Sequence, residues 1–286
     1  MPTLLASIEG ILVAELETGT EDMTVRVEGR VAVLAFNRPE ARNALTPQMY
    51  EGFQRVLPAV AADPDIGCLM LTGEGNAFCA GGDVKAMANR GAPGSAGAQT
   101  VEDRIDDLRH RQEQVSLALH ELPKPVLVAI PGPAAGAGLS IALAADVRIM
   151  ADTAFLTTAF AKVGFSGDFG GSWFLTQMVG TALAKELYFT ARRVDANEAL
   201  SLGLTNRVAP EAEFREAAMA FATEIASGPP IAHRLMKENL NRAIQHELKE
   251  CLAGEAAAMT RAGQTTDHKE AAKAFVEKRQ PVFTGR

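Results

Sequence analysis

Two glycine-rich stretches carry the most information about the fold: NAFCAGGDVK at residues 76–85 and GPAAGAGLS at residues 132–140. Each follows a short apolar run and precedes a helix-compatible one, so each is predicted to be a turn between a strand and a helix. Small residues let a ligand approach the backbone, and the start of a helix leaves N–H groups unpaired. The two turns are therefore predicted to aim backbone donors at one ligand atom.

Other roles for these stretches stay open. Neither has the spacing of a dinucleotide-binding or P-loop motif, so a nucleotide-phosphate site is disfavoured. The glycines of residues 132–140 can instead serve close helix packing. In the first stretch, Asp83 is expected to cap the next helix, and Lys85 either meets an anionic ligand or faces solvent.

The sequence pattern around the first turn predicts alternating strands and helices. Residues 23–28 and 31–36 are apolar, β-branched runs joined by Gly29-Arg30, which predicts a tight hairpin. Thr46-Pro47 supplies a helix N-cap and a first-turn proline, and Pro58 predicts that this helix kinks or ends early. Further predictions are strands at residues 67–72 and 126–130, a mobile loop at residues 89–99 and a long amphipathic helix from Val101 to Leu122.

The secondary structure predicted from the sequence changes near residue 210. Extended segments at residues 147–150 and 154–157 come before it, whereas beyond it apolar residues recur at helical spacing, with one break at Gly228-Pro229-Pro230. We therefore predict an N-terminal extension of residues 1–22, an α/β core of residues 23–209 and a helical C-terminal region of residues 210–286.

Composition excludes several classes of function. The chain has 286 residues, 47% of them hydrophobic, and a formal net charge of −7, which disfavours nucleic-acid binding by the whole molecule. No apolar run is long enough to cross a bilayer, and no basic signal segment begins the chain, so a cytoplasmic protein without a membrane partner is expected. The three cysteines and five histidines lack disulfide or metal-site spacing, so no metal is predicted.

Asp168 is the candidate for acid–base chemistry. Phe165, Phe169 and Trp173 lie close to it in the sequence, and glycines stand on both sides. An apolar environment raises the pKa of a carboxyl group, which suits a proton shuttle. The alternative is a turn aspartate that hydrogen-bonds its own backbone.

Several motifs together resemble the enoyl-CoA hydratase/isomerase (crotonase) superfamily. They are residues 37–45 (NRPEARNAL), both glycine turns, residues 191–204 (ARRVDANEALSLGL) and residues 274–283 (AFVEKRQPVF). The resemblance implies an α/β fold, a crotonase-like spiral of ββα repeats, followed by helices that form a homotrimer or a dimer of trimers. It implies an acyl-CoA substrate and no cofactor beyond the coenzyme A moiety of that substrate.

The resemblance also assigns roles to individual residues. In such enzymes two backbone N–H groups hold the thioester oxygen, and these fall here on Ala80 and Ala137. Phe275 and Lys278 are expected to reach the ligand of a neighbouring subunit. The other residues expected to line the substrate site are Ala41, Asn43, Ala44, Gly82, Asp83, Val84, Lys85, Gly136, Ser140 and Phe160.

The same resemblance separates two reactions. The glutamates that family hydratases use to activate water fall on Ser140 and Phe160, and neither side chain replaces a carboxylate. Asp168 falls on the loop from which family isomerases project one acidic residue. The leading hypothesis is an enoyl-CoA isomerase of fatty-acid or aromatic-acid catabolism, which moves a β,γ double bond into α,β conjugation or rearranges a related ring. The alternatives are a hydratase or other lyase, and a catalytically degenerate trimer that binds acyl-CoA.

Overall fold

The computed structural model describes residues 16–83 and 100–286. Val84, Lys85 and the loop expected at residues 89–99 lie outside the described residues. The strands are β1 (Met23–Glu28), β2 (Val31–Phe36), β3 (Cys68–Gly73), β4 (Val126–Ile130), β5 (Ala134–Ala135), β6 (Val147–Ala151), β7 (Phe155–Thr157), β8 (Val194–Asp195) and β9 (Arg207–Ala209).

The helices alternate with these strands as far as β9 and then follow one another. The α-helices are α1 (Pro47–Ala62), α3 (Val101–Gln112), α4 (Ala118–Glu121), α5 (Ala137–Leu143), α6 (Gly171–Thr190), α7 (Ala196–Ser201), α8 (Phe214–Ala226), α9 (Pro230–Ala243), α10 (Leu248–Ala262) and α11 (Thr266–Glu277). Short 3-10 segments are η1 (Pro39–Ala41), η3 (Phe160–Val163) and η4 (Glu211–Glu213), and η2 (Glu113–Leu117) is a π-helical turn.

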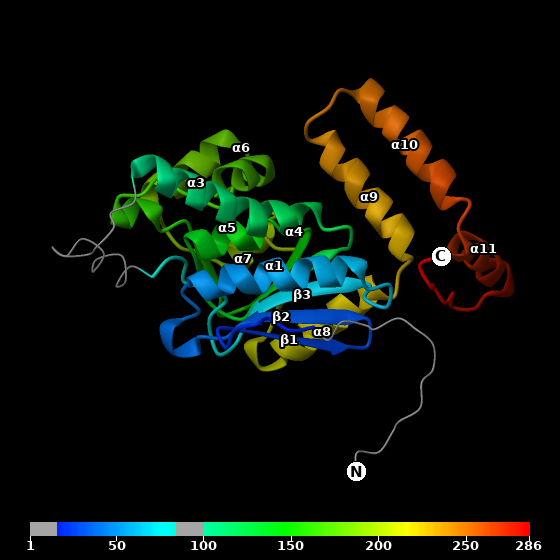
Figure 1. The fold of residues 1–286 in the computed structure, drawn as a ribbon, viewed down its shortest axis with the longest axis horizontal. Helices are drawn as coiled ribbons and strands as arrows, with labels where there is room; N and C mark the ends of the chain where they lie inside the picture. The colour runs from blue at the N-terminus through cyan, green and yellow to red at the C-terminus, as the bar shows by residue number, and fades with distance from the viewer. Residues whose placement is uncertain (1–15, 84–99) are drawn as a thin grey trace, which may run out of the picture.

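A six-stranded sheet in the order β1-β2-β3-β4-β6-β9 forms the centre of the molecule. The hairpin predicted between β1 and β2 is confirmed as an antiparallel pair, and the other neighbours are parallel. Every residue of β2 and β4 is buried, as expected for strands covered on both faces. Figure 1 shows α1 and α8 on opposite sides of these strands.

A smaller sheet brings the two glycine turns together. Its strands are ordered β5-β7-β8, and a parallel bridge joins Ala134 of β5 to Cys79 in the first turn. A second parallel bridge joins Leu45 to Gly82 on the other side of that turn. Since parallel strands end at the same edge, the ends of both turns meet there, which is where ligands bind in many α/β proteins.

Helix α1 confirms one sequence prediction and corrects another. Thr46 Oγ1 accepts a hydrogen bond from the Met49 N–H at 3.3 Å, as an N-cap does. Of the two outcomes predicted at Pro58, the early end is wrong, because the helix continues to Ala62. Pro58 lies on the exposed side of the helix, where water can bond the carbonyl that loses its donor.

Residues 101–121 are helical as predicted, but only the second half of this stretch is buried. Val101 and Ile105 are both 57% exposed, whereas Val115 and Leu119 lie in the core. The apolar residues at the start of α3 therefore do not pack into the core of the described chain.

The helical region after residue 210 divides into two parts. Helix α8 packs on β2, β3 and β6, so it belongs to the layers of the core. Helices α9, α10 and α11 project from that body, with α10 packed beside α9 (Figure 1). The predicted boundary at residue 210 stays a prediction, whereas the projecting part begins with α9. No helix within residues 16–83 and 100–286 is long and apolar enough to span a membrane.

Candidate active site

The two turns touch backbone to backbone, and glycine makes this possible. A Cβ atom on Gly138 would stand 2.3 Å from the Cys79 carbonyl oxygen, and one on Gly81 would stand 2.7 Å from the Ala135 carbonyl oxygen. The Ala135 N–H donates to the Cys79 carbonyl oxygen at 2.9 Å. The glycines therefore serve close packing, but between one turn and the other rather than between helices.

The second turn offers the donor predicted from the sequence. Ala137 is the first residue of α5, and its N–H has no hydrogen-bond partner among the described residues. Its nitrogen lies 3.2 Å from the point where a Cβ of Gly81 would stand, so it adjoins the first turn. Gly136 precedes it with φ at +55°, a conformation that favours glycine.

The first turn offers a different donor from the one predicted. The Ala80 N–H is not free, because it donates to the Arg42 carbonyl oxygen at 2.9 Å. The Gly82 N–H has no partner within residues 16–83 and 100–286. A trans peptide directs it away from the Gly81 carbonyl, which accepts the Leu45 N–H at 2.8 Å. The Gly82 N–H thus points away from Leu45, toward the side on which the second turn lies.

Ser140 and Phe160 both lie at the second turn. Ser140 is buried in α5, and its Oγ donates to the Gly136 carbonyl oxygen at 3.3 Å. The ring edge of Phe160 lies 3.7 Å from the point where a Cβ of Gly136 would stand. Neither residue brings a carboxylate to the unpaired donors, so the chemistry of a paired-glutamate hydratase has no counterpart at these two positions.

Asp168 lies in the loop between η3 and α6. Its Oδ1 is buried without a hydrogen-bond partner, and its side chain makes no hydrogen bond to backbone among the described residues. Burial raises the pKa of this carboxyl group to about 6, as the apolar neighbours predicted. The alternative role, a turn aspartate bonded to its own backbone, is therefore not observed.

Tyr188 is the residue of this site that the sequence analysis missed. Its hydroxyl oxygen lies 2.8 Å from the point where a Cβ of Gly171 would stand, and Ser140 Oγ lies 2.2 Å from the same point. Burial and the charge of Asp168 raise the pKa of Tyr188 to about 12. The signal in the sequence was Gly180, a glycine in an otherwise helical run, which can reverse the chain and return Tyr188 to the start of α6.

The aromatic residues near Asp168 do not form one pocket. Phe169 is buried and stacks on Tyr50 at 5.9 Å between ring centroids, and Phe165 is 57% exposed. Trp173 packs against Phe174. Of the aromatic residues named from the sequence, Phe160 is the one in contact with the second turn.

The segment that carries Ala41, Asn43 and Ala44, three of the residues expected to line the substrate site, is tied to the first turn by the Asn43 side chain. The Asn43 side chain accepts the Arg38 N–H at 2.8 Å and donates to the carbonyl oxygens of Glu74 and Ala77 at 3.0 and 2.8 Å. Its amide is thus used inside the fold, and Asn43 positions the segment rather than presenting the amide to a ligand.

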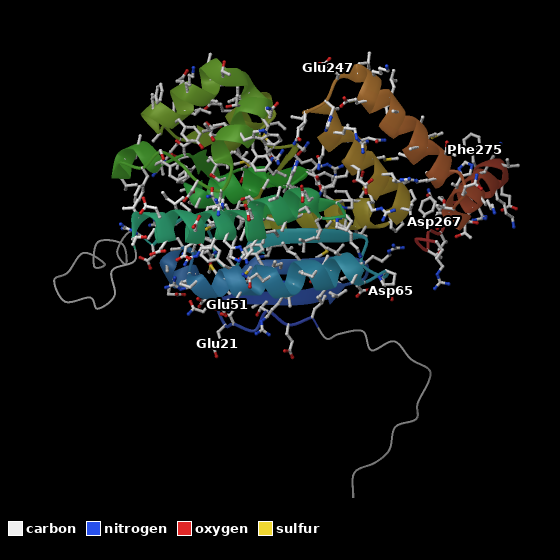
Figure 2. The ribbon with its side chains drawn as sticks, turned by 45° about the horizontal axis from the view of Figure 1, so that its top comes forward. Glu21, Glu51, Asp65, Glu247, Asp267 and Phe275 are labelled. Carbon is white, nitrogen blue, oxygen red and sulfur yellow. The ribbon has the colours of Figure 1, made fainter. Side chains whose placement is uncertain are left out.

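The other expected binding residues fall into three groups. Ala44 is buried, Ala41, Gly82 and Asp83 are half-buried, and Val84 and Lys85 lie outside the described residues. Phe275 and Lys278 are exposed, and Figure 2 shows Phe275 at the far end of the projecting helices. A single chain does not bring these two residues to the turns, so their predicted role requires another subunit.

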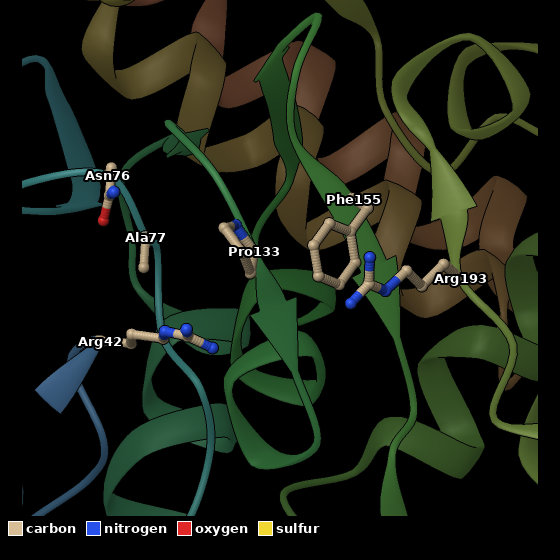
Figure 3. A pocket seen from close by; sticks show the side chains of 6 residues that line it. All are labelled: Arg42, Asn76, Ala77, Pro133, Phe155 and Arg193. Carbon is tan, nitrogen blue, oxygen red and sulfur yellow. The ribbon is translucent and has the colours of Figure 1, made fainter.

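Two cavities of the described chain are not lined by the residues that carry the unpaired donors. One of about 260 Å³ is lined by Ala77 and Pro133, at the beginnings of the two turns, and by Arg42 and Phe155 (Figure 3). The other, about 1070 Å³, lies between α6 and α9. Within the described residues no cluster of histidine, cysteine, aspartate and glutamate could hold a metal ion.

Comparisons with known proteins agree with this fold. Residues 26–286 match the family model described as "Enoyl-CoA hydratase/isomerase". The chain is 35% identical to the short-chain-enoyl-CoA hydratase of Clostridium acetobutylicum, over 88% of this chain and 94% of that protein. It is 34% identical to the 1,2-epoxyphenylacetyl-CoA isomerase of Escherichia coli, over 91% and 97%. The crystal structure of an enoyl-CoA hydratase from Polaromonas superposes with a TM-score of 0.81, at 34% identity, over 91% and 99%.

The fold, the paired turns and these matches define a crotonase-fold enzyme, of a class that acts on acyl-CoA substrates. The chain belongs to the enoyl-CoA hydratase/isomerase family. Hydratases and an isomerase both occur among its relatives. Membership therefore fixes the substrate class and leaves the reaction to the residues beside the turns.

Proposed function

We propose that this chain is an enoyl-CoA isomerase that uses one carboxylate, Asp168, as both base and acid. The observation that carries the proposal is the buried, unpartnered Oδ1 of Asp168, in a site where Ser140 and Phe160 stand in place of carboxylates. Its pKa of about 6 leaves a base that is ionised at neutral pH and still able to return a proton.

The proposed reaction moves one proton. Asp168 takes a proton from the α carbon of a β,γ-enoyl-CoA, the electron pair of that C–H bond moves toward the thioester, and a dienolate forms. Its oxygen accepts hydrogen bonds from the N–H groups of Gly82 and Ala137, which stabilise the negative charge. Asp168 then returns the proton to the γ carbon, so that the double bond shifts and the carboxylate is regenerated.

The test is conversion of β,γ-enoyl-CoA to the conjugated product by wild type and Asp168→Asn. Asparagine keeps the shape of the side chain and removes the base, so we expect turnover to fall by a factor of about 10² to 10⁴. Unchanged turnover in the variant would end the proposal. Asp152→Asn is the control, since Asp152 lies in the turn between β6 and β7 and accepts the Glu211 N–H at 2.9 Å.

A hydration reaction is the second candidate, favoured by the names of several relatives. It would require water placed by Asp168 and Ser140, and its product would be a 3-hydroxyacyl-CoA. Incubation of an α,β-enoyl substrate in H₂¹⁸O separates the two reactions, because only hydration adds the labelled oxygen to the product.

Assembly into trimers is proposed together with this function. Leu240, Leu248, Met259 and Phe275 on the projecting helices are 69%, 73%, 76% and 85% exposed, which is costly for a monomer in water. Light scattering is expected to give three or six times the chain mass of 30.3 kDa. A monomer at micromolar concentration would contradict this assembly.

A further inference from the structure

Tyr188 lies directly over the loop that carries Asp168. A Cβ atom on Gly167 would stand 2.8 Å from Cε1 of the tyrosine ring and 3.2 Å from its hydroxyl oxygen. A Cβ atom on Gly171 would stand 2.8 Å from the same oxygen. The hydroxyl group is therefore in close contact with glycines on both sides of Asp168, and a larger side chain at either glycine would displace it.

A reversal of the chain brings Tyr188 to this place. In a straight helix, residues 171 and 188 would be about 25 Å apart along the axis. Gly180 interrupts α6 with φ at +75° and ψ at 166°, which turns the second half of the helix back. Phe160 then stacks on the Tyr188 ring, with the centroids 6.0 Å apart and the planes 18° from parallel. The ring is held by packing, so its hydroxyl has a defined position.

The hydroxyl of Tyr188 and the carboxyl group of Asp168 are complementary. Tyr188 makes no hydrogen bond within residues 16–83 and 100–286, and Asp168 Oδ1 is a buried acceptor without a donor. The other hydroxyl beside Gly171, that of Ser140, already donates to the Gly136 carbonyl oxygen. Of these two hydroxyls, Tyr188 is therefore the one with an uncommitted hydrogen.

The other groups packed around the Asp168 loop carry little charge toward it. From the helical stretch that begins with α3, Gln112 Oε1 accepts the Phe169 N–H at 2.7 Å, and the Arg111 guanidinium lies 5.3 Å from the centre of the Tyr50 ring. Lys162 of η3 is exposed. Burial alone accounts for the raised pKa of Asp168, whereas the charge of Asp168 contributes to the raised pKa of Tyr188.

We infer that Tyr188 is a positioning residue for Asp168: the two side chains are not hydrogen-bonded in this conformation, and once the carboxylate is ionised it turns to accept a hydrogen bond from the Tyr188 hydroxyl, which holds it toward the substrate. This inference rests on the proposed role of Asp168 as the base. A donor to the charged form favours that form, so the contact lowers the pH at which the base becomes available. When Asp168 takes the substrate proton, this hydrogen bond weakens, and the carboxyl group can turn to deliver the proton at the other carbon.

The test is Tyr188→Phe in the full chain, which keeps the stacked ring and removes the hydroxyl. We expect the acid limb of the pH profile of kcat/KM to move up by about one pH unit. A hydrogen bond to a charged group stabilises that group by about the free energy that corresponds to one pKa unit. The variant would then be about tenfold slower below pH 6 and nearly unchanged above pH 8. Thr190→Val is the control, since it removes an exposed hydroxyl two residues on that donates to the Glu186 carbonyl oxygen.

A double-mutant cycle separates this inference from the proposed function. The pH dependence of urea unfolding is measured for wild type, Tyr188→Phe, Asp168→Asn and the double variant, and it needs no turnover. Coupling between the two sites at pH 8 that is absent at pH 4 supports the contact, even if Asp168→Asn keeps full activity and the isomerase proposal fails. Additive effects at both pH values, with an unmoved acid limb, would overturn the role of Tyr188 while leaving Asp168 as the base.

Discussion

The turn pair (residues 76–83 and 132–138) and the facing group (Ser140, Phe160, Asp168 and Tyr188) are built by different forces. Within the turn pair, backbone meets backbone at distances that exclude a Cβ at Gly81 and Gly138. The facing group is held by side-chain packing, such as the stacked rings of Phe160 and Tyr188. Backbone geometry tolerates few sequences, whereas a packed side chain can be exchanged for another of similar volume. One scaffold can therefore stabilise an enolate while its facing group changes the reaction.

Substitution in the turn pair is expected to have the largest effect on stability. Gly138→Ala places a Cβ 2.3 Å from the Cys79 carbonyl oxygen, and the backbone of Cys79 is also joined to the second turn by the bridge to Ala134. We expect a loss of about 3 kcal/mol or more in the free energy of unfolding, measured in urea.

The matched control for this substitution is Gly263→Ala. Gly263 has φ at −63°, and its nearest contacts to a new Cβ are ordinary ones at 3.5 and 3.6 Å. It should change stability by less than about 0.5 kcal/mol. Equal effects of the two substitutions would mean that the turns are not packed as described.

The same difference explains what could be predicted from the sequence. Glycines between a strand and a helix identified both turns, because few other residues permit such close approach. Asp168 was found because its apolar neighbours are adjacent in sequence. Tyr188 was missed because it comes to Asp168 through the reversal at Gly180, a tertiary effect. The donor in the first turn was misplaced from Gly82 to Ala80, since local sequence does not determine which N–H a neighbouring segment takes up.

The facing group makes a smaller, pH-dependent contribution to stability. The pKa of Asp168 is about 6 in the folded protein, above the ordinary value of 3.8. Between these values the folded state keeps a proton that the unfolded state has lost, so this group lowers the free energy of unfolding as pH rises through that window. Asp168→Asn removes the buried charge that destabilises the folded state at high pH. At pH 8 the free energy of unfolding of the variant is expected to exceed that of wild type by at most about 3 kcal/mol.

Urea unfolding of both proteins at pH 4 and pH 8 checks this expectation. The difference between wild type and Asp168→Asn should be small at pH 4 and should grow toward pH 8, because only the wild-type side chain becomes charged. A difference that is the same at both pH values would show that the Asp168 carboxyl group is not desolvated. It would also remove one physical reason for regarding this residue as a proton shuttle.

The smallest expected effect on stability comes from the chain reversal at Gly180, which assembles the facing group. Gly180→Ala meets no neighbouring atom within 4 Å, yet φ of +75° with ψ of 166° is a conformation that alanine rarely adopts. We expect a cost of about 2 kcal/mol in urea unfolding. If the reversal at Gly180 delivers Tyr188 to Asp168, the variant should also reproduce the upward shift of the acid limb expected for Tyr188→Phe. A loss of stability with an unmoved acid limb would mean that the facing group keeps its arrangement without the glycine, and that packing by Phe160 alone positions Tyr188.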